Sequence, residues 1–262
     1  MYQPHLRTVS AIRYVTPLRE GGSLPAIVEA DDDGTYVLKF RGAGHGDKAL
    51  IAELLAGEMA RALGLPTPEL VLITLDAGLG RAERDPEIRS LIHASDGLNL
   101  GVDYLPGAIG FEVFDRDQLD PLLASAVVWF DAFISNVDRT ARNPNLLFWK
   151  KQLWLIDHGA AFYFHYTWRD ADAQSNSPFA PIKDHVLLPA ATLLSEADSQ
   201  LRARLSPDVF ESIVALIPSD WLDGEPLPQM ARRAAYVRYL RQRLEAAHIF
   251  VEEARRARAQ RV

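Results

Sequence analysis

The stretch that decides the fold is SNVDRTARNPNLLFWKKQLWLIDHGAAF, residues 135–162. It contains two apolar runs, NLLFW and QLWLID, on either side of Lys150-Lys151, and this pattern predicts a β-hairpin. Asp138 and Asn143 precede the hairpin, and Asp157 ends it. The stretch therefore places three side-chain oxygen ligands around one hairpin.

The order of these residues resembles the catalytic loop of protein kinases, in which an Asp is followed five residues later by Asn and a later hairpin delivers a metal-binding Asp. Mg²⁺ bridges the phosphates of ATP and prefers oxygen ligands. We therefore expect Asn143 and Asp157 to bind Mg²⁺, and Asp138 to orient an attacking hydroxyl and accept its proton. An isolated Asn-Pro-Asn turn would be an ordinary loop, so only the ordered set carries the interpretation. An EF-hand is excluded because its sixth and twelfth positions, counted from Asp138, are Asn143 and Trp149 instead of Gly and Glu.

A lysine upstream fits the same interpretation. Lys39 lies late in the run TYVLKF, which predicts a strand, and a helix is expected after it with Asp47 as its N-cap. Glu53 on that helix is the expected ion-pair partner of Lys39, and Glu58 on the same helix is the competitor. A strand often exposes a lysine by simple alternation, so Lys39 indicates a functional site only together with the aspartates downstream.

Two further segments give weaker signals. Gly21-Gly22-Ser23 lies between the first two predicted strands, where glycine backbone amides and a serine hydroxyl could contact phosphate, although a plain turn explains it nearly as well. Tyr104-Leu105 precedes a Pro-Gly break at the end of the β-rich part. We expect this segment to be a hinge whose backbone binds adenine.

Composition excludes several classes of protein. The 262 residues include no cysteine, which excludes disulfides and thiolate chemistry. The net charge of −7 argues against direct nucleic-acid binding, and the arginine-rich segment from Arg232 to Arg261 has the apolar spacing of an amphipathic helix. No apolar run is long enough to span a membrane and the N-terminus has no signal-like segment, so a cytoplasmic protein is expected. Neither a P-loop nor a Gly-x-Ser-x-Gly motif is present.

The predicted elements divide into two parts. Short Val- and Ile-rich runs separated by glycines and aspartates make residues 1–108 β-rich with one long helix, and residues 109–262 are mainly helical. The expected helices in the second part are 118–135, 190–203, 207–216 and 227–258. We expect an α+β fold whose two lobes together form one domain.

Four segments in order, GGSLPAIVEADDDGTYVLKF, AELLAGEMARALGLPTPEL, NVDRTARNPNLL and LWLIDHGAAF, resemble the HipA-like kinases, in particular a short branch without the usual N-terminal subdomain. The resemblance implies a protein-kinase-like two-lobed fold, use of ATP with Mg²⁺, and phosphorylation of Ser or Thr. It also implies that Ser23 is a site of inhibitory autophosphorylation and that an antitoxin partner exists. HipA proteins commonly have His two residues after the catalytic Asp, whereas this chain has Thr140 there and Arg139 before it.

The resulting hypothesis is an ATP- and Mg²⁺-dependent Ser/Thr protein kinase of the toxin–antitoxin kind. Asp138-Arg139 also resembles the phosphoinositide kinases, so a lipid or small-molecule hydroxyl substrate is the first alternative. The second alternative is a non-catalytic ATP-binding module. Such modules usually lack the lysine or one of the two aspartates, and this chain has all three.

Overall fold

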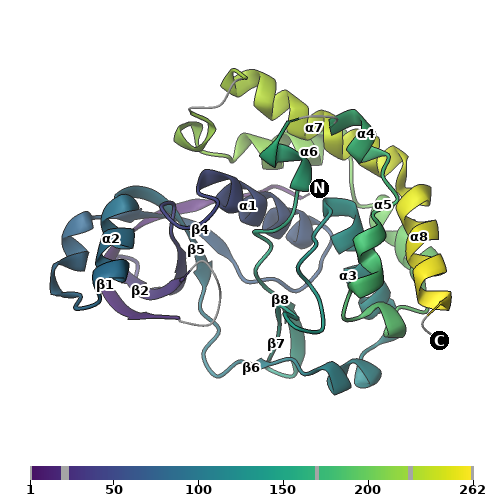
Figure 1. The fold of residues 1–262 in the computed structure, drawn as a ribbon, viewed down its shortest axis with the longest axis horizontal. Coiled ribbons are helices and arrows are strands. Elements are labelled where there is room, and N and C mark those ends of the chain that lie inside the picture. The colour runs from purple at the N-terminus through teal and green to yellow at the C-terminus, as the bar shows by residue number, and fades with distance from the viewer. Residues whose placement is uncertain (1, 19–23, 169–170, 224–226, 261–262) are drawn as a thin grey trace.

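The computed structural model describes residues 2–18, 24–168, 171–223 and 227–260. Figure 1 shows two parts that differ in secondary structure. Strands dominate the chain up to residue 103, whereas helices dominate from residue 121 onward. This confirms the predicted α+β arrangement with a small β-rich and a larger helical lobe. Among the described residues, no helix is both long and apolar enough to cross a bilayer.

Five strands of the first part close into a barrel with a small core of its own. In β2 and β3 burial alternates along the strand, as expected when one face of a sheet is covered, and Val28 and Leu38 are fully buried. Parallel pairing of β1 with β4 closes the barrel. The strands follow the order β1-β2-β3-β5-β4, with bounds β1 (Arg7–Pro17), β2 (Ala26–Ala30), β3 (Thr35–Lys39), β4 (Leu70–Leu75) and β5 (Gly97–Asp103).

Helix α1 (Asp47–Ala62) connects the two parts. Its buried side chains join the large apolar cluster of the helical part and not the core of the barrel. The prediction that Asp47 caps this helix is wrong: the N-cap is Gly46, at φ 60°, where a residue without Cβ is favoured. The Asp47 carboxylate instead accepts from Nε of Arg41 at 2.6 Å. Gly64, at φ 72°, follows the end of the helix.

The hairpin predicted in residues 145–157 is present. Lys150 and Lys151 form its turn with φ angles of 49° and 64°, as a two-residue turn that matches the twist of the strands requires. A short strand after the barrel pairs with the hairpin, so the chain enters the second part through this sheet. The strands are β6 (Ile109–Gly110), β7 (Leu146–Trp149) and β8 (Gln152–Leu155). The connection from β4 to β5 contains α2 (Pro86–Ala94), whose N-cap is Asp85.

Helix α3 lies at the centre of the helical part, and its side chains are buried on every face from Ala124 onward. The single helix expected over residues 227–258 is wrong, because the chain bends at Ala246 and forms two helices, α7 and α8 (Figure 1). The bend lets α7 pack on α6 and α4 while α8 packs on α3 and α5. The helices are α3 (Pro121–Ile134), α4 (Ala171–Ser175), α5 (Leu194–Arg202), α6 (Pro207–Ala215), α7 (Gln229–Glu245) and α8 (Ala247–Ala259).

Candidate active site

The two parts of the chain meet at an ion pair. Lys39 is the last residue of β3, and its Nζ lies 2.8 Å from Oδ1 of Asp157, which follows β8. The Lys39 side chain is 13% exposed and that of Asp157 is 39% exposed, so the pair is open to solvent on the aspartate side. The structure therefore joins the predicted lysine of the barrel to the predicted aspartate of the hairpin.

Glu53 lies behind this pair, buried in α1. Its Oε2 accepts from the backbone N–H of His158 at 2.7 Å, which ties α1 to the residue after Asp157. A direct ion pair between Glu53 and Lys39 was expected, and none shorter than 4 Å exists between these two described side chains. Glu58, the competitor, is buried elsewhere and accepts from the hydroxyl of Tyr2.

Charges in this cluster shift each other's protonation. Burial alone would lower the pKa of Lys39, but Glu53 and Asp157 outweigh it and raise that pKa above its ordinary value. Burial alone would raise the pKa of Glu53, but Lys39 and His158 outweigh it and hold that pKa below its ordinary value. At neutral pH Lys39 is therefore a cation and Glu53 an anion. The ring of His158 packs edge-on against Phe130.

Asp138 lies next to the hairpin and is held by two asparagine amides. Its Oδ2 accepts from Nδ2 of Asn143 at 2.7 Å and from Nδ2 of Asn145 at 3.3 Å. Asn145 also donates to the backbone oxygen of Asp157 at 3.4 Å, so it bridges the two aspartates. Asn145 was missed from the sequence, although an Asn after Pro144 at φ 50° is typical of the left-handed region.

The pKa of Asp138 is raised above its ordinary value. Burial is the main cause and the charge of Asp157 adds to it, whereas the two asparagine amides and Arg139 oppose the shift. A carboxylate with a raised pKa is a better proton acceptor, because its affinity for the proton is higher. The three predicted side chains Asp138, Asn143 and Asp157 thus lie together.

Arg139, the residue behind the phosphoinositide-kinase comparison, faces the core. It is 1% exposed, and its Nε lies 2.5 Å from Oδ2 of Asp131 on α3. Its Nη1 donates to the backbone oxygen of Asn145. His185 contacts the same Asp131 oxygen at 2.9 Å. This buried network fixes the loop on either side of Asp138.

The network was not predicted from the sequence, although one signal was present. Asp131 interrupts the otherwise apolar run VVWFDAFI of α3, and a buried carboxylate requires partners. Burial favours its neutral form, but Arg139 and His185 outweigh this and keep the pKa of Asp131 below its usual range. Asn136 links the network to the loop, because its Nδ2 donates to Asp131 at 3.0 Å and its Oδ1 accepts from the Asp138 backbone N–H at 3.2 Å.

The expected hinge crosses between the two parts after β5. The backbone N–H of Tyr104 donates to Thr35 at 3.0 Å, and the backbone oxygen of Leu105 accepts from Ala108 at 3.1 Å. Tyr104 is 36% exposed, whereas Leu105 is buried. The other weak prediction, Gly21-Gly22-Ser23, lies outside the described residues.

The donor set suits a hard divalent cation. The ammonium group of Lys39 already lies against Asp157, so this carboxylate is positioned for a positive charge. Asn143 donates through its amide nitrogen to Asp138, which leaves its amide oxygen for another partner. One carboxylate and one neutral oxygen are ligands that Mg²⁺ accepts when phosphates and water complete its shell. In the described part of the chain no group of three His, Asp or Glu side chains forms a metal site.

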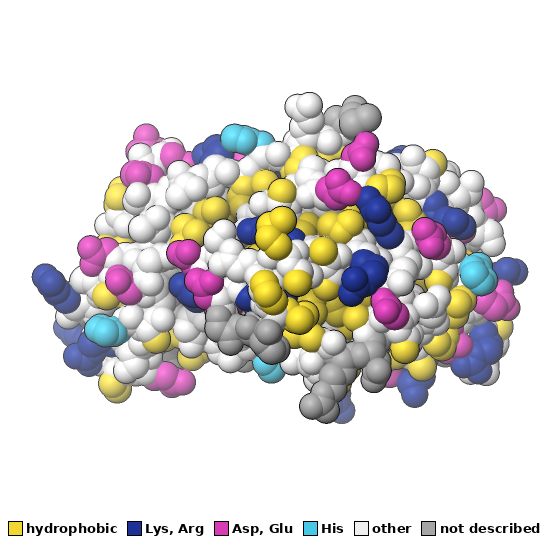
Figure 2. Space-filling model, turned by 90° about the horizontal axis from the view of Figure 1, so that it is seen from above, with side chains coloured by type: hydrophobic (Ala, Val, Ile, Leu, Met, Phe, Trp, Pro, Cys, Tyr) yellow, Lys and Arg dark blue, Asp and Glu magenta, His cyan; other side chains and the backbone are white. Residues whose placement is uncertain are grey.

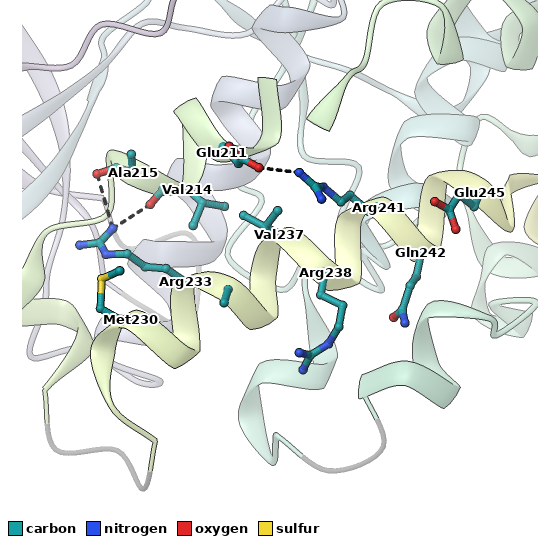
Figure 3. Close-up of a pocket in the computed structure, with 11 residues that line it drawn as sticks. Glu211, Val214, Ala215, Met230, Arg233, Val237, Arg238, Arg241, Gln242 and Glu245 are labelled. Atoms are coloured by element: carbon teal, nitrogen blue, oxygen red, sulfur yellow. Dashed lines mark hydrogen bonds and ion pairs between the residues drawn. The ribbon is translucent and has the colours of Figure 1, made fainter. Parts of the chain in front are cut away.

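A groove lies away from these residues. It has a volume of about 680 Å³ between α6 and α7, and Figure 3 shows Val237 facing α6 while Arg241 pairs with Glu211. Arg233 donates to the backbone oxygens of Val214 and Ile217, so its charge is satisfied within the groove wall. Figure 2 shows hydrophobic side chains gathered at the centre of the upper face, the side of Figure 1 on which α6 and α7 lie. No predicted site residue lines this groove.

Comparisons with known proteins bear on the fold and the family of the chain. The crystal structure of the Helicobacter pylori proinflammatory kinase CtkA is similar with a TM-score of 0.55 at 14% identity, over 94% of this chain and 99% of that one. The Golgi casein kinase with Mn/ADP bound gives a TM-score of 0.49 at 13% identity, over 96% of this chain and 74% of that one. No curated protein matches the sequence. The HipA-like kinase family matches residues 11–250, so the chain belongs to the HipA-like kinases.

Proposed function

We propose that the chain is an ATP- and Mg²⁺-dependent kinase that transfers phosphate to a Ser or Thr hydroxyl of a protein. The observation that carries the proposal is the convergence of Lys39, Asp157 and Asp138, joined by the 2.8 Å ion pair and by Asn145. These groups come from both parts of the chain, and a buried network holds the loop between them. Membership in the HipA-like kinases supports the same activity.

In this proposal the residues have separate tasks. Lys39, kept charged by Glu53 and Asp157, binds the negative charge of the phosphates. Asn143 and Asp157 hold Mg²⁺, which when bound neutralises charge on the transferred phosphoryl group. Asp138 orients the acceptor hydroxyl and takes its proton as the oxygen bonds to phosphorus and ADP leaves. Tyr104 and Leu105 offer backbone groups to adenine.

The proposed lobe boundary stays at residue 108, just before β6, although the buried side chains of α1 join the core of the helical part.

Gly21, Gly22 and Ser23 are proposed to contact phosphate, with Ser23 as an autophosphorylation site. Mass spectrometry of the purified chain tests Ser23 directly. Phosphate on Ser23 in the unchanged chain and none in an Asp138→Asn variant would support this role, and an unmodified Ser23 after incubation with ATP would exclude it.

The substrate class needs its own experiment. The chain is incubated with labelled ATP and Mg²⁺, in one arm with protein mixtures and in the other with lipids and small hydroxyl metabolites. The two arms distinguish a protein substrate from a lipid or small-molecule substrate. We expect label on protein Ser or Thr only. Label on a small molecule alone would overturn the protein-substrate proposal. The buried position of Arg139 removes the observation that favoured the lipid alternative.

The proposed antitoxin partner and the non-catalytic alternative have simple tests. Co-purification with a protein encoded beside this chain, and loss of its phosphotransfer activity on binding, would support a toxin–antitoxin pair. Activity that no such protein alters would count against it. Absence of any Mg²⁺-dependent ATP turnover would favour a non-catalytic binding module.

A further inference from the structure

A second pocket lies where α1 begins, and none of its lining residues belongs to the candidate active site. Its volume is about 420 Å³. The first turn of α1 forms one wall, and α7 contributes Arg232 and Tyr236 to the opposite wall. Trp168 and Trp221 also line it. The pocket thus combines a helix N-terminus with an arginine and aromatic side chains.

Arg232 has an unusual environment. It is 3% exposed, its Nε is enclosed without an acceptor, and no hydrogen bond or ion pair reaches its guanidinium group within the described residues. Burying an unpaired positive charge is costly in free energy, because the ion loses its hydration. An arginine kept in this state indicates a place for an acidic group that the described residues do not supply.

The first turn of α1 also offers donors. No side chain caps α1, whose N-cap is Gly46, and the first amides of a helix have no acceptor inside it. Amides at a helix N-terminus favour negative charge. A guanidinium group and helix amides therefore belong to the lining of one cavity.

Two carboxylates also line the pocket, and both have partners. Asp47 accepts from Nε of Arg41 at 2.6 Å, and Asp223 accepts from Nε2 of Gln229 at 2.7 Å. Lys48 is a further cation of the lining, and its Nζ donates to the backbone oxygen of Tyr166 at 3.3 Å. The acidic groups are therefore engaged, while the Arg232 guanidinium group is not.

We propose that this pocket binds a phosphate-type oxyanion, with Arg232 as its main ligand. A tetrahedral dianion has enough acceptor oxygens for the guanidinium and backbone donors together. The aromatic walls leave room for the body of a phosphate monoester beside the anion. Inorganic phosphate and phenyl phosphate share the recognised group and differ only in that body.

Isothermal titration calorimetry of the full chain with each of these two anions tests the proposal. We expect saturable binding at one site that Arg232→Gln weakens by at least about tenfold, as loss of a charged hydrogen bond should. Arg238→Gln removes the same charge from an exposed position on α7 and should leave affinity unchanged. Tighter binding of phenyl phosphate would identify a monoester as the ligand, and equal binding would identify free phosphate.

The Lys39→Met variant separates this pocket from the proposed active site. It should bind both anions as the unchanged chain does, even if no kinase activity is found. Absence of saturable binding to the unchanged chain, equal binding by Arg232→Gln, or equal loss in Arg238→Gln would each overturn the proposal. So would loss of binding in Lys39→Met alone.

Thermal unfolding covers the case in which Arg232→Gln alters folding. Because the charge is unpaired, Arg232→Met should not lower the melting temperature in phosphate-free buffer. Phosphate should raise the melting temperature of the unchanged chain and not that of Arg232→Met. A lower melting temperature without phosphate would show that Arg232 is a structural residue and would contradict the proposal.

Discussion

Lys39 and Asp157 are 118 positions apart in the sequence, yet the ammonium of the first lies 2.8 Å from the carboxylate of the second. The lysine belongs to the barrel and the aspartate to the end of the hairpin. Glu53 ties the same point to α1 through the backbone of His158. Three structural units therefore share one charged cluster, and a change in any of these side chains should affect the others.

Replacing Lys39 with Met tests the role of the ammonium group. We expect phosphotransfer to fall by roughly two orders of magnitude or more, because one of the groups that stabilises the phosphates is removed. The measurement is the initial rate of label transfer from ATP. Lys151→Met, at the exposed turn of the hairpin, removes the same charge and should leave the rate unchanged. Equal rates in all three chains would show that Lys39 takes no part.

Replacing Asp138 with Asn separates transfer from binding. The amide cannot accept the proton of the hydroxyl, so we expect the transfer rate to fall by roughly 10²–10⁴-fold. Nucleotide affinity, measured by calorimetry with ADP and Mg²⁺, should be retained, because Asp138 is not among the proposed phosphate or metal ligands. The control is Asp117→Asn, because the Asp117 side chain is 75% exposed and pairs with Arg116. Retained transfer in Asp138→Asn would exclude the proposed role.

Much of the fold follows from short-range signals in the sequence. The hairpin around Lys150-Lys151 is set by residues a few positions apart, and its prediction is confirmed. The cap of α2 at Asp85 is equally local. The proximity of Asp138, Asn143 and Asp157 follows from the same hairpin. Closure of the barrel by β1 and β4 depends on pairs of residues 64 positions apart (Arg7 with Val71), which local periodicity does not encode.

Other features depend on tertiary packing. No Pro or Gly marks the bend at Ala246, which instead lets α7 and α8 cover different helices. Glu53 was predicted as the partner of Lys39 because their separation in the sequence suits a strand followed by a helix. The distance of each carboxylate from the Lys39 ammonium group, however, depends on how α1 packs on the hairpin. Arg139 looked like a substrate-facing residue because sequence does not show that Asp131 lies beneath it.

Replacing Arg139 with Met tests the buried network. It leaves Asp131 buried with His185 as its main partner, so we expect the free energy of unfolding to fall by roughly 3–5 kcal/mol. Urea unfolding measures this change. A double variant that also carries Asp131→Leu should recover part of the loss, because it removes the unpaired carboxylate.

The matched control for Arg139 is Arg255→Met. The side chains of Arg255 and Glu252 are 58% and 73% exposed on α8, where water screens both charges, so this variant should unfold almost as the unchanged chain does. Similar losses in Arg139→Met and Arg255→Met would contradict the importance of the network. If Arg139→Met folds normally but loses phosphotransfer, Arg139 would act on the substrate, and the lipid alternative would regain support.

His165 makes stability depend on pH. It is fully buried beside Tyr236, and burial, together with the charges of Lys48 and His45, lowers its pKa from 6.5 to about 3. The unfolded chain therefore binds a proton at this residue between pH 6.5 and about 3, whereas the folded chain does not. Stability should fall as pH falls through this window, by up to about 1.4 kcal/mol per pH unit from this group.

The variant His165→Asn keeps a polar atom near Tyr236. When urea unfolding is measured between pH 7 and 5, its free energy of unfolding should depend less steeply on pH, by about one proton. His93→Asn, at an exposed position on α2, is the control and should keep the slope of the unchanged chain. An unchanged slope in His165→Asn would show that another group accounts for the acid sensitivity.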